Sequence, residues 1–153
     1  MLLWRLSTHQ HADSFDGGYG LLFDGRWNTV GHAVTYCATS PSLCVLEKLV
    51  HIEDPALLPD LIMLAYEAPV SLPTEQVKLD ELPNDWRHQE SWTQKRGDKW
   101  HQACAMPLLQ VPSVIVSIAD SADTNVLINH KHSAVGEIRV RRCEPFVLDP
   151  RLF

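Results

Sequence analysis

The chain has 153 residues, of which 45% are hydrophobic and 21% charged, as is typical of a globular domain that buries its own core. Its net charge is −6, whereas nucleic-acid binding depends on basic side chains that meet phosphates, so nucleic-acid binding and RNA cleavage are disfavoured. No apolar run approaches the roughly 18 to 20 residues of a membrane helix, and the N-terminal residues lack the apolar core of a signal peptide. We expect one cytoplasmic domain over residues 1–153.

The first part of the chain is predicted to contain two strands separated by a long loop. Residues 2–6 and 32–38 have strand-like patterns, and Tyr36 lies on one side of the second strand. Residues 9–28 between them are rich in Gly, Asp and Ser. A loop of this length in a compact domain is usually functional or mobile.

Two helices are predicted, and the first has clear start signals. Ser40 fits the N-cap position and Pro41 the first helical position, and the helix is expected to run to about Ile52. The second helix is predicted over about residues 91–104, weakened by Gly97.

The remaining chain is predicted to consist mainly of strands. A near-continuous apolar run predicts a buried strand at residues 61–67, and a short strand at 77–79 is a weaker prediction. Further strands are expected at residues 114–118, 125–129, 138–142 and 146–148. Many strands with two separated helices indicate an α+β domain.

The cysteines and histidines give little support for disulfides or a metal site. No Cys-x-x-Cys spacing occurs, and we expect small core residues at Cys37, Cys44, Cys104 and Cys143. His9-x-His11 and His130-x-His132 would each place two ligands on one side of a strand. No third ligand stands at a recognisable spacing, so no metal is expected.

The loop motif Gly25-Arg26-Trp27-Asn28 is the first candidate for chemistry. Glycine lets the backbone approach a ligand closely, and the guanidinium of Arg26 matches the geometry of phosphate oxygens. The alternative is an ordinary surface loop in which Trp27 is an anchor.

Three further residues are candidates, each with a structural alternative. Tyr36 is either a site residue or a half-buried core aromatic. Glu47 falls at the border of the buried helix face, where most carboxylates are simply solvated. Ser113, in a Val-Pro-Ser segment predicted to precede a strand, either holds a ligand or caps a backbone group.

Taken in order, these segments resemble the RES family, which is named for its Arg, Glu and Ser residues. The resemblance runs through nearly the whole chain, over Gly25-Arg26-Trp27-Asn28, Tyr36, Ser40-Pro41-Ser42-Leu43, Leu46-Glu47-x-Leu49-Val50-His51, Asp85-Trp86-Arg87, Gly97-Asp98-x-Trp100, Val111-Pro112-Ser113, Asn129 and Phe146-x-x-Asp149-Pro150-Arg151-Leu152.

The resemblance implies a fold, an activity and a partner. RES proteins are toxins of bacterial toxin–antitoxin pairs, and their partner is an Xre-like helix-turn-helix antitoxin. The implied fold is a small single α+β domain with an ADP-ribosyltransferase-like mixed or antiparallel sheet and flanking helices. Family members deplete NAD by hydrolysis or phosphorolysis, and some are reported as ADP-ribosyltransferases. NAD would then be the substrate, with no separate cofactor.

The resemblance also implies site residues. Arg26, Tyr36 and Glu47 take catalytic positions, Arg26, Tyr36 and Ser113 contact the substrate, and Arg5 takes a further NAD-contacting position. Arg26 suits the pyrophosphate, and the Glu47 carboxylate would stabilise positive charge that develops on the ribose when the nicotinamide leaves. Ser113 would either hold the nicotinamide amide or stabilise its loop.

The Asn129 segment departs from the family pattern. The family often has Asn-Pro-x-His-Pro, whereas His130 and Ser133 stand here in place of the prolines. The sequence therefore leaves the roles of Asn129 and His132 open.

Three other functions remain as alternatives. A protein ADP-ribosyltransferase would use the same site but pass ADP-ribose to a side chain. A non-enzymatic binding module would need Arg26 and Glu47 to be merely structural. An RNA-cleaving toxin is disfavoured by the acidic charge.

Overall fold

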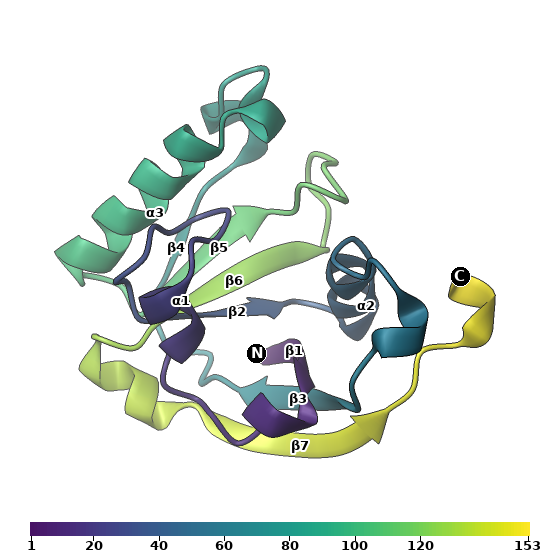
Figure 1. The fold of residues 1–153 in the computed structure, drawn as a ribbon. Helices are drawn as coiled ribbons and strands as arrows, with labels where there is room; N and C mark the ends of the chain where they lie inside the picture. The colour runs from purple at the N-terminus through teal and green to yellow at the C-terminus, as the bar shows by residue number, and fades with distance from the viewer.

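Seven strands form one mixed sheet in the computed structural model, which describes residues 1–153 (Figure 1). The spatial order is β4-β5-β6-β2-β1-β3-β7, and every neighbouring pair is antiparallel except β4–β5. The strands are β1 (Leu2–Thr8), β2 (Val34–Ala38), β3 (Leu61–Glu67), β4 (Thr74–Gln76), β5 (Leu108–Pro112), β6 (Thr124–Asn129) and β7 (Arg139–Phe146). One residue pair, Trp4 with Ala38, joins β1 to β2.

Three α-helices and six short 3-10 helices complete the domain. The α-helices are α1 (Gly18–Leu22), α2 (Pro41–Leu49) and α3 (Glu90–Ala103). The 3-10 helices are η1 (His9–His11), η2 (Pro55–Leu57), η3 (Leu79–Glu81), η4 (Trp86–His88), η5 (Ser133–Glu137) and η6 (Pro150–Leu152). No helix is long and apolar enough to cross a membrane.

The predicted start of α2 is confirmed. The Ser40 hydroxyl accepts a hydrogen bond from the amide of Leu43, and Pro41 occupies the first helical position, where its missing N–H costs nothing. The helix ends at Leu49, a few residues before the expected end at Ile52.

Several strand predictions after residue 67 are wrong. Residues 114–118 form no strand, and the strand lies just before them, in β5. Residues 77–79 follow β4 instead of forming a strand of their own. The two strands expected at 138–142 and 146–148 are one edge strand, β7, which tolerates Pro145 because one of its sides needs no ladder hydrogen bonds.

Both long helices cover the same face of the sheet. Side chains alternate along β2, so Val34, Tyr36 and Ala38 share one face. Trp100 of α3 packs in a core cluster with Val34 and Leu127, whereas Leu43 of α2 packs in another cluster with Ala38. In Figure 1, α3 and α2 flank β6 and β2 from two sides. The sheet face between the helices is therefore a natural place for a site.

The opposite face carries the largest core cluster. Leu3, Cys37, Leu64, Val126 and Ile128 belong to this cluster. The long segment before β2 contributes to it through Ala12 and Phe15, and η5 contributes Val135. The segment predicted as a loop therefore also covers core.

Candidate active site

The loop that carries Arg26 is held by one side of α3. The hydroxyl of Thr93 donates a hydrogen bond to the carbonyl of Arg26 over 2.6 Å. The side-chain amide of Gln94 donates to the carbonyl of Gly25 over 3.1 Å. Since both donors come from the second turn of a 14-residue helix, the backbone around Arg26 is fixed by a rigid element.

Gly97 allows this loop to lie directly on α3. A Cβ atom at Gly97 would stand 1.8 Å from the carbonyl oxygen of Trp27, a distance that no side chain can occupy. The Trp27 ring is 1% exposed and lies 6.2 Å, centroid to centroid, from the ring of Trp86. Trp27 is therefore the buried anchor that the sequence offered as an alternative. Because it is the next residue in the chain, it also fixes the backbone position of Arg26.

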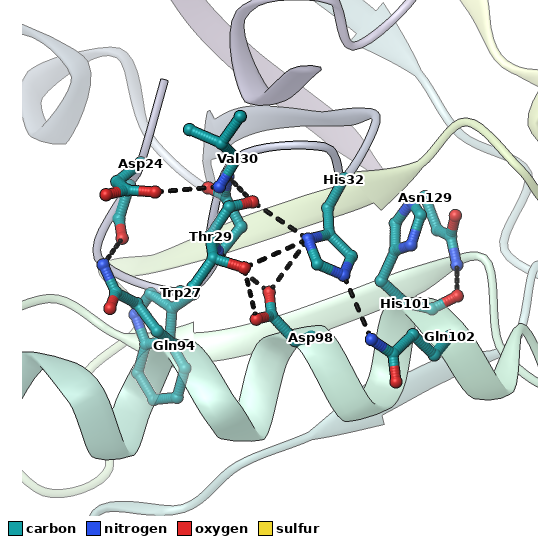
Figure 2. A network of polar contacts seen from close by, with 12 residues as sticks. Asp24, Trp27, Thr29, Val30, His32, Gln94, Asp98, His101, Gln102 and Asn129 are labelled. Atoms are coloured by element: carbon teal, nitrogen blue, oxygen red, sulfur yellow. Dashed lines mark hydrogen bonds and ion pairs between the residues drawn. The ribbon is translucent and has the colours of Figure 1, made fainter. Parts of the chain in front are cut away.

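Asp98 closes the far end of the loop (Figure 2). Its carboxylate accepts hydrogen bonds from the amide of Thr29 over 2.9 Å and from the Thr29 hydroxyl over 2.7 Å. Nδ1 of His32 lies 3.3 Å from the same carboxylate and 2.9 Å from the carbonyl of Thr29. On the other side of the loop, Asp24 accepts from the amide of Val30. These contacts hold both ends of the segment from Asp24 to His32.

Tyr36 supports the same loop from the sheet. Its hydroxyl accepts a hydrogen bond from the amide of Trp27 over 2.9 Å and donates one to Oδ1 of Asn28 over 2.7 Å. Burial raises the pKa of the Tyr36 phenol well above its usual value, so the group stays neutral and is not a general base. The geometry gives Tyr36, a half-buried residue, a positioning role.

Glu47 is held by one residue of β6 and by one residue that directly follows β5. Oε1 of Glu47 accepts hydrogen bonds from Nδ2 of Asn125 over 2.7 Å and from the hydroxyl of Ser113 over 3.0 Å. No hydrogen bond within the protein reaches Oε2. The half-buried carboxylate therefore has one fixed oxygen and one oxygen free to meet a ligand.

Ser113 both caps the backbone and touches Glu47. Its fully buried hydroxyl group accepts hydrogen bonds from the amides of Ile115 and Val116 and donates one to Oε1 of Glu47. The sequence predicted Ser113 before a strand, but it follows β5. The capping alternative is confirmed, and the hydrogen bond to Glu47 means that Ser113 also orients this carboxylate.

Register places Tyr36 beside the Glu47 group. Ala38 pairs with Asn125, and Tyr36 pairs with Leu127. Tyr36 and Asn125 are thus diagonal neighbours on one sheet face, typically about 7–8 Å apart between Cα atoms. The residues along this face, in order from α3 to α2, are the Arg26 loop, Tyr36, Asn125 and Glu47.

Arg26 is half-buried and makes no ion pair. One guanidinium nitrogen, Nη1, donates to the backbone carbonyl of Arg87 over 3.1 Å, which leaves the remaining donors unused. An unpaired, oriented guanidinium is suited to bind phosphate oxygens.

Arg5 is not part of this arrangement. Trp4 pairs with Ala38, so the next residue, Arg5, lies on the face opposite to Tyr36. There Nη1 of Arg5 donates to the carbonyl of Ser14 over 2.8 Å and to the hydroxyl of Tyr66 over 3.3 Å. Sequence order alone could not separate Arg5 from the other candidates.

The Asn129 segment has structural contacts of its own. The buried Asn129 amide donates to the carbonyl of His101, and its oxygen accepts from the amide of Lys131. Nε2 of His130 lies 2.8 Å from the hydroxyl oxygen of Thr35, and His132 caps the start of η5. No group of three or more His, Cys, Asp or Glu side chains lies together as a metal ion would require.

Two residues of the site were missed from the sequence. Asn125 was predicted only as the first residue of a strand, and Asp98 appeared only within the family motif Gly97-Asp98-x-Trp100. Their partners, Glu47 and Thr29, lie 78 and 69 residues away in the chain. No local pattern could have linked them.

Fold and site together define a small α+β protein with a Tyr and a Glu on one side of its sheet and an Arg in the loop that the Tyr holds. The RES domain model matches residues 2–149, so the chain belongs to the RES-domain family, as the motifs predicted.

Two curated relatives show how far the similarity extends. The chain is 37% identical to "Toxin Res" of Pseudomonas putida over 155 aligned positions that cover 100% of both proteins. It is 33% identical to the "Prs ADP-ribosylating toxin" of Sphingobium sp., over 97% of this chain and 94% of that protein.

A solved structure has the same fold at low sequence identity. It is a chain of the M. tuberculosis MbcT–MbcA toxin–antitoxin complex, with a TM-score of 0.74, 16% identity and coverage of 95% of this chain and 84% of that one. This likeness confirms the predicted fold class, a small single α+β domain built on a mixed sheet.

Proposed function

We propose that this chain is the toxin of a toxin–antitoxin pair and that it degrades NAD by cleaving the nicotinamide–ribose bond. The observation that carries the proposal is the placement of Arg26, Tyr36 and Glu47 along one sheet face between α2 and α3. Membership of the RES family and the toxin names of its full-length relatives support it.

The reaction separates positive charge from the nicotinamide and places it on the ribose. The bond between ribose C1′ and the nicotinamide nitrogen breaks, and its electron pair leaves with the neutral nicotinamide. The free Oε2 of Glu47 is suited to stabilise the resulting oxocarbenium-like ribose and to accept a hydrogen bond from a ribose hydroxyl.

The other residues bind and orient the substrate. Arg26 binds the pyrophosphate, because this half-buried residue carries a guanidinium that makes no ion pair within the protein. Tyr36 holds that loop in place and offers its ring face to the nicotinamide ribose. Asn125 and Ser113 keep Glu47 oriented, which limits the reorganisation that the transition state requires.

The acceptor completes the chemistry. Water adds its oxygen to C1′ and loses a proton, which yields ADP-ribose, nicotinamide and H⁺. Inorganic phosphate adds through an oxygen instead and yields ADP-ribose 1″-phosphate. The proposal covers hydrolysis and phosphorolysis, since both use the same bond and the same residues.

Protein ADP-ribosylation is the second candidate. The observation that favours it is the Sphingobium relative, whose name is "Prs ADP-ribosylating toxin" and which matches 97% of this chain. The same leaving step would then be followed by attack of a protein side chain on C1′.

The proposed partner is an Xre-like antitoxin with a helix-turn-helix domain, acting in the cytoplasm, where NAD is available. The support is the family and the toxin–antitoxin complex in which the structural neighbour was solved. NAD is the substrate in this proposal, and we propose that neither a metal nor a resident cofactor takes part.

The test is incubation of the purified chain with NAD, with and without phosphate, followed by chromatography of the products. We expect nicotinamide to appear together with ADP-ribose or its 1″-phosphate, with activity unchanged by thorough chelation. Labelled NAD added to a lysate gives the other arm. Label in protein bands with little free ADP-ribose supports the second candidate, and no loss of NAD in either arm contradicts both.

Cell experiments test the toxin role. Expression without the antitoxin should stop growth and lower cellular NAD while RNA stays intact. Normal growth with unchanged NAD would support a non-enzymatic binding module.

A further inference from the structure

A hollow of about 600 Å³ lies next to the Arg26 loop, because Arg87, whose carbonyl accepts a hydrogen bond from Arg26, is one of its lining residues. Its lining consists of Ser117 and of nine residues between Leu79 and His88, in and around η3 and η4. Ser117 belongs to the loop that begins at Ser113, the partner of Glu47. The hollow is thus tied to both parts of the candidate active site.

Arg26 and Arg87 meet at this junction, and the carboxylates of Asp80 and Asp85 line the same hollow, where Asp85 accepts a hydrogen bond from the side chain of Gln89. Neither Arg26 nor Arg87 makes an ion pair, although the chain carries a net charge of −6 and several other arginines are paired with acidic side chains. A guanidinium that makes no ion pair within the protein can bind an anion with several oxygens, such as a pyrophosphate.

The lining beyond these arginines suits a purine nucleoside. Leu79 and Leu82 offer apolar surface, while Asp80 and His88 have exposed side chains with no hydrogen-bond partner in the protein. A flat base can stack on imidazole or guanidinium planes, and a carboxylate can accept from ribose hydroxyls or an exocyclic amine. The volume lies within the range of small-molecule sites, roughly 300–1,000 Å³.

We propose that this hollow binds the adenosine half of NAD, with the pyrophosphate between Arg26 and Arg87. The nicotinamide ribose then extends along the sheet face past Tyr36 toward Glu47. The inference rests on the proposed function, because it assigns a subsite to the same substrate.

Filling the hollow tests the assignment. Ser117→Trp places a large side chain in it, and Ile118→Trp adds the same group at the next position, which is 67% exposed and does not line the hollow. Both are made in the Glu47→Gln chain, so that NAD binding is measured by calorimetry without turnover. In the otherwise unchanged chain, cleavage of nicotinamide mononucleotide is measured, since it has the scissile bond and one phosphate but no adenosine.

We expect Ser117→Trp to weaken NAD binding by about tenfold or more, and Ile118→Trp to change it by less than about twofold. Cleavage of the mononucleotide by Ser117→Trp should fall by less than about threefold. If Ser117→Trp does not fold, as judged by thermal melting, Asp80→Trp fills the hollow from another lining segment and carries the same expectation.

The failures are distinguishable. If the unmodified chain cleaves neither NAD nor the mononucleotide, the proposed function is wrong. If it cleaves NAD and the folded filling variant binds NAD as tightly as the Ile118→Trp control, the hollow is not the adenosine site. Equal losses on NAD and on the mononucleotide would also overturn the assignment, because the effect would then not depend on adenosine.

Discussion

Asn125 donates a hydrogen bond from Nδ2 to Oε1 of Glu47 over 2.7 Å and so links β6 to α2 across the site. Ser113 donates to the same oxygen, so both bonds fix one side of the carboxylate. Oε2 is left for a ligand. The carboxylate is therefore oriented before any substrate binds, which is the condition for efficient electrostatic stabilisation of a transition state.

Glu47→Gln should lower the rate of NAD cleavage by about a hundredfold or more, equivalent to about 3 kcal/mol. The amide oxygen can still accept from Asn125, but the negative charge opposite the developing ribose cation is gone. NAD binding and melting temperature should change little, because the ground-state ribose is neutral. Single-turnover kinetics, calorimetry and thermal melting measure the three quantities.

The matched control is Glu53→Gln, which removes a charge from an exposed position after α2. A Glu47→Gln protein that folds, binds NAD and still cleaves it within a few-fold of the unmodified chain would remove Glu47 from the mechanism.

Asn125→Ala should reduce kcat for NAD by about tenfold while KM changes by less than about threefold. A hydrogen bond to a charged group contributes roughly 1.5–3 kcal/mol, and its loss lets the Glu47 carboxylate rotate. Steady-state kinetics with NAD separates the two constants. A drop in melting temperature with kcat unchanged would mean that Asn125 is only structural.

Arg26→Lys should weaken NAD affinity by about tenfold, or roughly 1.4 kcal/mol. Lysine keeps the charge but loses the planar fork that contacts two phosphate oxygens, and it cannot reproduce the oriented bond to the Arg87 carbonyl. Calorimetry in the Glu47→Gln background measures this, with Arg141→Lys on the exposed edge strand as control. Unchanged affinity with collapsed turnover would show that Arg26 acts on the transition state.

Gly97→Ala should both destabilise the protein and damage NAD cleavage. The new methyl group would stand 1.8 Å from the Trp27 carbonyl, so the Arg26 loop must move off α3. Overpacking of this kind costs about 1–3 kcal/mol, which corresponds to several degrees in Tm for a domain of this size.

Gly136→Ala is the matched control, because a Cβ atom there meets nothing within 4 Å. We expect its Tm and activity to stay close to those of the unmodified chain. A Gly97→Ala protein with full activity would show that the loop position does not matter for the reaction.

His130 should make the protein less stable as the pH falls from about 6.5 toward 4. Burial lowers the pKa of His130 to about 4, against its usual 6.5, while nearby Asp16 acts in the opposite direction. Between these two pH values the unfolded chain binds a proton at His130 that the folded chain does not bind. The free energy of unfolding therefore decreases as the pH falls, and the decrease levels off below the pKa of the folded state.

Denaturant unfolding at a series of pH values measures this slope. His130→Gln should flatten it, whereas His51→Gln, at an exposed position, should not. An unchanged slope in His130→Gln would assign the effect to other groups, such as His101, whose pKa is also lowered by burial.

The features that depend on local signals could be predicted from the sequence. The apolar run at residues 61–67 matches β3 at both ends, because a strand buried on both faces needs apolar side chains throughout. Ser40 and Pro41 marked the start of α2 because a cap and a fixed φ act within one turn. The order of the motifs was enough to predict the family and the fold class.

Which residues share the site could be learned only from the folded chain. A one-residue step along a strand reverses the face, so Arg5 and Tyr36 could be separated only once the pairing of Trp4 with Ala38 was known. The bonds of Asn125 to Glu47 and of Asp98 to Thr29 join residues far apart in the chain. Such contacts exist because the sheet register and helix packing bring the partners within hydrogen-bond distance, and no periodicity within a short window encodes that distance.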